Sequence, residues 1–79
     1  MKPEKSKKIR ALQAVYGRPW WQVALEAANE PLSQSKLAVR WTAAVSATYP
    51  HIRYSQQDVC RIIARAIERA SELAADSAA

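Results

Sequence analysis

Side chains able to do catalytic or metal chemistry are few in this sequence, and they stand far apart. The chain has one histidine, His51, one cysteine, Cys60, and seven carboxylates spread along its length. A catalytic site needs titratable groups that converge on one point, and a nucleophilic cysteine needs a neighbouring base. The only glycine, Gly17, cannot by itself build a phosphate-binding loop or a dinucleotide-binding turn. The sequence therefore predicts a protein that is not an enzyme, with no catalytic residue, no metal site and no cofactor.

His51 and Cys60 each have a structural interpretation. His51 lies in a connector that follows Pro50, where we expect a solvated imidazole. Cys60 falls at the edge of an apolar helix face, where we expect a small buried hydrophobe. A lone cysteine excludes an intramolecular disulfide, and no apolar run is long enough for a bilayer span or a secretory signal. We therefore expect a cytoplasmic protein with no membrane partner.

The positive charge of the chain is concentrated at its N-terminal end. The net charge is +5, and the first 18 residues hold six lysines and arginines against one glutamate, Glu4. Basic segments of this kind neutralise phosphates and release counterions from nucleic acid. We predict a basic N-terminal arm over about residues 1–8, and nucleic-acid contacts from Lys2, Lys5, Lys7, Lys8 and Arg10. The alternative interpretation is a solvated tail that aids solubility.

The apolar periodicity and the alanine-rich composition predict helices throughout the chain. The caps, the single glycine and the prolines divide the chain into four helices, expected from near residue 3 to 17, from 19 to about 29, from 33 or 35 to about 48, and from 55 to about 75. At 79 residues the chain has room for one core. The predicted fold is all-α: a single domain over residues 1–79, built as a small bundle of three to four short helices.

The start of the last expected helix has a motif of its own. Ser55 and Asp58 imitate a capping box. Residues 54–62, Tyr-Ser-Gln-Gln-Asp-Val-Cys-Arg-Ile, also resemble the recognition helix of helix-turn-helix regulators. The resemblance covers about nine residues, and it implies that Gln56, Gln57 and Arg61 face the major groove, glutamine reading adenine and arginine reading guanine. Those regulators carry a short turn before this helix, whereas here the corresponding region contains Tyr49-Pro50 and Arg53.

The same helix has a second interpretation. Arg61, Arg65 and Arg69 share their face with Glu68 and Glu72, at spacings that favour ion pairs along a solvent-exposed surface. This pattern is typical of a helix whose charged face makes no external contact. We keep both interpretations, and we name Gln57, Arg61 and Arg65 as further nucleic-acid-binding candidates.

The adjacent residues Trp20 and Trp21 are candidates for binding a partner. The apolar side chains of their helix cover an arc of about 200°, wider than an ordinary surface helix requires. Adjacent helical residues diverge by about 100°, so two large rings side by side cannot both point at one core centre. We expect core packing for at least one ring, and an exposed anchor for a larger protein or a second copy from the other.

These observations give two hypotheses of function. The first is a small, non-enzymatic, nucleic-acid-associated regulatory protein that binds DNA or RNA, in which the basic arm contacts phosphates and the helical body positions the arm. The second is a protein-protein interaction module, an inhibitor or adaptor of phage or plasmid type, that docks through the tryptophan-containing helix. A homodimer is compatible with either hypothesis.

Overall fold

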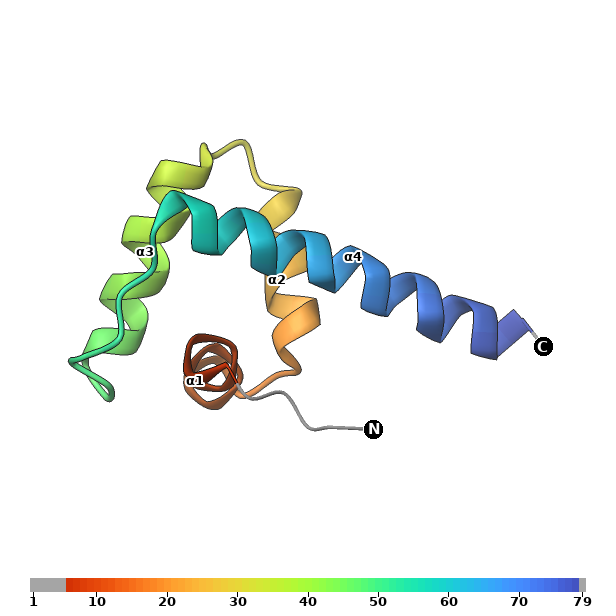
Figure 1. The fold of residues 1–79 in the computed structure, drawn as a ribbon, viewed down its shortest axis with the longest axis horizontal. Coiled ribbons are helices and arrows are strands. Elements are labelled where there is room, and N and C mark those ends of the chain that lie inside the picture. The colour runs from red at the N-terminus through yellow and green to blue at the C-terminus, as the bar shows by residue number, and fades with distance from the viewer. Residues whose placement is uncertain (1–5, 79) are drawn as a thin grey trace.

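The computed structural model describes residues 6–78, and within them the chain forms four helices and no strand (Figure 1). The helices are α1 (Lys7–Tyr16), α2 (Trp20–Ala28), α3 (Gln34–Ser46) and α4 (Gln56–Ala78). The predicted all-α bundle is confirmed. Most of the predicted basic arm, including Lys2 and Lys5, lies outside the described residues.

The first helix begins and ends at local signals. The Ser6 hydroxyl oxygen accepts a hydrogen bond from the Ile9 N–H at 3.4 Å, so α1 begins at Lys7 instead of near Pro3. At the other end, Gly17 takes the left-handed conformation, with φ of 66°, and its N–H donates to the Gln13 carbonyl. Glycine adopts this conformation without a steric penalty, which is why the helix stops where the sequence predicted.

The boundaries of α2 and α3 also follow the sequence. Pro19 precedes α2, because the N–H that proline lacks has no partner in the first turn of a helix. Ser33 caps α3 by accepting a hydrogen bond from the Lys36 N–H at 3.2 Å. Both starts agree with the prediction.

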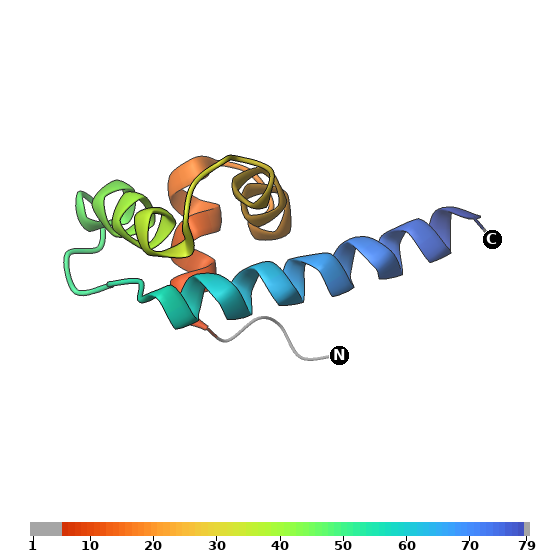
Figure 2. The same ribbon diagram turned by 90° about the horizontal axis from the view of Figure 1, so that it is seen from above.

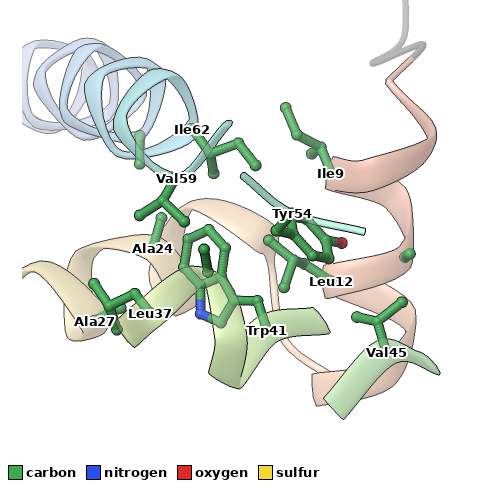
Figure 3. Packing of buried hydrophobic residues seen from close by; sticks show 13 residues of the cluster. Ile9, Leu12, Ala24, Ala27, Leu37, Trp41, Val45, Tyr54, Val59 and Ile62 are labelled. Atoms are coloured by element: carbon green, nitrogen blue, oxygen red, sulfur yellow. The ribbon is translucent and has the colours of Figure 1, made fainter. Parts of the chain in front are cut away.

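The core forms where all four helices meet (Figure 3). Its largest fully buried side chains are Trp41, Leu12, Leu37, Val45 and Val59. The ring of Trp41 meets the ring of Tyr54 edge to face, with centroids 5.7 Å apart and planes at 81°. Tyr54 belongs to the connector between α3 and α4, so this contact fixes the connector against the core.

The fourth helix is much longer than the other three. Its first half packs against α2 and α3, and its last turns extend past the rest of the bundle (Figures 1 and 2). Val59, Ile62 and Ala66 are buried, whereas Ile67 is 53% exposed. None of the helices in residues 6–78 is long and apolar enough to cross a membrane.

The expectation that Cys60 is buried is wrong. Cys60 is exposed, although its neighbour Val59 is fully buried. Successive residues turn by 100° around a helix axis, and the side of α4 that α2 and α3 cover is centred on Val59 and Ala66. The sequence pattern included Cys60 at the edge of this face, but the bundle covers a narrower strip of the helix.

Candidate nucleic-acid interface

The N-terminus of α4 is closed by the capping box that the sequence predicted. The Ser55 hydroxyl oxygen accepts a hydrogen bond from the Asp58 N–H at 3.1 Å. In return, Asp58 Oδ2 accepts hydrogen bonds from the Ser55 N–H at 2.9 Å and from the Ser55 hydroxyl at 3.0 Å. The reciprocal bonds satisfy donors that the first turn of a helix would otherwise leave without partners.

Asp58 also holds two cations. Its residue is only 5% exposed. Its Oδ2 forms an ion pair with the ammonium of Lys8 on α1, and its Oδ1 lies 2.8 Å from Nη2 of Arg61. Burial alone would raise the pKa of Asp58, but the hydrogen bonds from Lys8, Ser55 and Arg61 outweigh burial and lower the pKa. The carboxylate is therefore ionised at neutral pH and holds Lys8 and Arg61 on either side of it.

A second contact joins α1 to the chain just before α4. The Tyr54 hydroxyl donates a hydrogen bond to the Lys8 carbonyl oxygen. The Tyr54 N–H donates to the Thr42 hydroxyl on α3 at 2.8 Å. Burial raises the pKa of Tyr54, and the charges of Tyr16 and Asp58 add to this effect. Because Tyr54 contacts both α1 and α3, it fixes the position of Lys8 relative to the start of α4.

These contacts build a pocket of about 500 Å³ between the N-terminus of α1 and the first half of α4. We call it the basic pocket, and its lining residues are Ser6, Lys7, Lys8, Ile9, Asp58, Arg61, Ile62 and Arg65. Among residues 6–78, four cations and one carboxylate therefore face the same space. The two segments are about fifty residues apart in the sequence, so only the tertiary structure brings their charges together.

Of the other predicted nucleic-acid residues, Lys2 and Lys5 are outside the described residues, and Arg10 and Gln57 lie outside the basic pocket. Arg10 lines a neighbouring pocket together with Lys7. Gln57 is exposed on α4, one turn before Arg61. Gln56 accepts a hydrogen bond from the Ser35 hydroxyl at 3.0 Å. The basic pocket thus unites four of the eight predicted residues, Lys7, Lys8, Arg61 and Arg65.

The charged face of α4 makes some of the contacts expected of a solvent-exposed helix. Arg61 pairs with Asp58, and Arg69 lies 3.6 Å from Glu72, both at i,i+3. Arg65 also contacts α2, where its guanidinium carbon lies 6.0 Å from the ring centroid of Trp20. The segment before α4 is a connector over residues 47–55, not the short turn of a helix-turn-helix motif.

Trp20 and Trp21 are both half-buried and pack against the core. The first half of α4 crosses α2, the helix that carries both rings (Figure 1). The large hydrophobic side chains that are exposed are instead Val39, Tyr49 and Ile67. None of these three was predicted from the sequence to be exposed. Ile67 lies midway along α4 and is turned by about 100° from the fully buried Ala66.

Within residues 6–78, no group of three or more histidine, cysteine, aspartate or glutamate side chains lies in a position to hold a metal ion. Comparison of the chain with protein-family models, with curated proteins and with solved structures gives no match. Function must therefore be argued from the geometry and chemistry of the site.

Proposed function

We propose that this protein binds nucleic acid without catalysing a reaction, and that phosphate groups occupy the basic pocket. The observation that carries the proposal is the convergence of Lys7, Lys8, Arg61 and Arg65 on one space. Phosphate oxygens are strong acceptors, and arginine guanidinium groups can donate to them in pairs. The basic pocket fits an anionic ligand better than any other class of ligand.

The carboxylate of Asp58 does not cancel this charge. It faces four cations and already accepts hydrogen bonds from two of them, Lys8 and Arg61. The side chain of Arg61 is 77% exposed, so its remaining donors are open to solvent. Asp58 therefore acts as an anchor that limits the movement of the two cations. Cations held in place lose less conformational freedom when they bind phosphate.

Phosphate contacts fix the position of a protein on nucleic acid but do not read its sequence. Gln57 supports a second kind of contact, because it is exposed and lies four residues from Arg61, on the same face of α4. Glutamine can donate to and accept from an adenine edge. A regulatory role follows if Gln57 reads a base while the basic pocket holds the backbone.

The proposal is tested by fluorescence anisotropy with labelled duplex and single-stranded DNA over a series of salt concentrations. The test variant is Lys7→Ala combined with Arg61→Ala. The matched control is Lys36→Ala combined with Arg53→Ala, which removes the same charge from exposed positions outside the basic pocket.

We expect the test variant to bind more weakly and to reduce the slope of log affinity against log salt by about 2. The control variant should keep most of the wild-type slope of log affinity against log salt. Equal loss in both variants would mean that net charge, and not the basic pocket, attracts the nucleic acid. No binding by the wild-type protein at low salt would contradict the proposal outright.

A second candidate function is association with another protein, and one observation favours it. The last turns of α4 extend past the bundle (Figure 2), and Ile67, midway along this helix, is 53% exposed. Docking would then use the exposed side of α4 around Ile67 in place of Trp20 and Trp21. Light scattering of the wild type and of Ile67→Glu, over a range of concentrations, tests the simplest case, a second copy. A wild-type monomer throughout would exclude self-association.

A further inference from the structure

A smaller pocket of about 310 Å³ lies next to the basic pocket. We call it the aromatic pocket, and its lining residues are Lys7, Arg10, Ala11, Ala14, Tyr49 and Ile52. Lys7 lines both pockets, so the two open on either side of one lysine at the start of α1. A ligand that follows the surface of α1 can therefore reach both.

The walls of the aromatic pocket differ in chemistry. Ala11 is buried and Ile52 is half-buried against the core, so one side is apolar and firmly packed. Lys7 and Arg10 contribute two cations, and none of the lining residues within the described part of the chain is a carboxylate. The remaining wall is Tyr49, whose residue is 38% exposed. The pocket thus combines an aromatic ring, an apolar wall and positive charge.

The backbone that carries Tyr49 is held by hydrogen bonds. The Tyr49 N–H donates to the Val45 carbonyl at 2.7 Å, and the Ile52 N–H donates to the Tyr49 carbonyl at 3.1 Å. The first bond continues from the C-terminal end of α3, and the second closes a turn. The ring of Tyr49 is therefore attached to a fixed support, which lowers the entropic cost of stacking on it.

An aromatic ring beside cations is the arrangement by which proteins bind single-stranded nucleic acid, since bases stack on the ring while the backbone follows the positive charge. In a duplex the bases are stacked on one another and cannot enter such a pocket. The volume lies at the lower end of the range for small-molecule pockets, so one base fits within it.

We propose that the aromatic pocket accepts one unpaired base of a single-stranded nucleic acid, stacked on Tyr49, while the adjoining phosphates lie on Lys7 and Arg10. This inference rests on the proposed function and narrows it, because it makes the preferred ligand a single strand. Lys7 lines both pockets, so it then contacts the phosphate that links the stacked base to the phosphates in the basic pocket.

The test compares three labelled probes: an oligothymidylate of about 12 nucleotides, an abasic strand of the same length, and a duplex of that length. Tyr49→Ala should weaken binding of the oligothymidylate about fivefold or more, the effect of losing one stacked base. It should leave the affinity for the abasic strand and for the duplex unchanged. Tyr49→Phe should bind as the wild type does, and Val39→Ala serves as the control for removal of an exposed apolar side chain.

The outcomes separate this inference from the proposed function. Suppose that Tyr49→Ala binds the oligothymidylate as tightly as the wild type, while Lys7→Ala with Arg61→Ala weakens binding. Base stacking in the aromatic pocket is then wrong, and phosphate binding in the basic pocket is supported. Equal weakening for all three probes would also overturn the inference, because the abasic strand has no base to stack. If the wild type binds none of the probes at low salt, both proposals fail. Circular dichroism of each variant verifies that the helices are intact.

Discussion

Lys8 and Asp58 form an ion pair that joins the first turn of α1 to the first turn of α4. The carboxylate is almost fully buried, whereas the lysine side chain is partly open to solvent. The pair therefore has two consequences. It joins α1 to α4 at the edge of the core, and it holds the Lys8 ammonium at the rim of the basic pocket. Part of the Lys8 charge is used within the protein, so we expect Lys7 to contribute more than Lys8 to phosphate binding.

Replacing Asp58 with alanine should lower the free energy of unfolding by about 1–3 kcal/mol, because the variant loses the capping box and the partner of Lys8. Lys8 is 40% exposed, so water takes over part of its solvation and limits the loss. Urea denaturation followed by circular dichroism measures the difference. An unchanged midpoint would show that the α1 to α4 contact adds nothing to stability.

The stability that Asp58 provides should also depend on pH. Its pKa is lowered in the folded protein, so the folded state favours the ionised carboxylate. This contribution is fully present above the ordinary aspartate pKa of about 4 and is lost as the pH falls below that value. The gap in unfolding free energy between the wild type and Asp58→Asn should therefore narrow as the pH falls from about 4 towards 2. If the gap in unfolding free energy stays constant over this range, the ionised Asp58 carboxylate does not stabilise the folded state.

Two isoleucines on α4 provide a matched comparison. Ile62 is 4% exposed and faces the core, whereas Ile67 is 53% exposed and points away from it. Ile62→Ala should cost about 2–5 kcal/mol, the effect of a cavity in a packed core. Ile67→Ala should cost less than about 1 kcal/mol, because little of its surface is buried in one chain. Similar losses in the two variants would mean that the end of α4 is covered in solution.

Tyr54 should be stabilising in its neutral form. Its pKa is raised in the folded protein, so its contribution is present below the ordinary tyrosine pKa of about 10 and is lost as the pH rises above it. Tyr54→Phe should lower stability by about 1 kcal/mol at neutral pH, since the bond to the Lys8 carbonyl is removed. Alkaline titration of tyrosinate absorbance should lose its highest-pH component in this variant. Retention of that component would assign it to another tyrosine.

Cys60 should be accessible in the folded protein. The structure exposes the residue, so a thiol reagent should modify it in native buffer as readily as in urea. A buried thiol would instead react only when the chain opens. Protection of Cys60 that disappears in urea would support the original expectation of a buried side chain, or a second copy covering this part of α4.

The sequence alone determined the local structure of this protein. Ser33, Gly17 and the pair of Ser55 with Asp58 act on backbone groups within a few residues, so their effects could be predicted without knowing the fold. The apolar periodicity of α4 likewise identified Val59, Ile62 and Ala66 as core residues.

Only the tertiary structure decided which surfaces meet. Lys8 and Arg61 share Asp58 because α1 packs beside the start of α4, and nothing in the spacing of these residues encodes that contact. The exposure of Cys60 and Ile67 depends in the same way on how wide a strip of α4 the neighbouring helices cover, because each directly follows a fully buried residue, Val59 or Ala66. Periodicity gives the direction of a side chain around its own helix, but burial and charge pairing depend on the neighbouring helices, whose positions are set by packing of the whole chain.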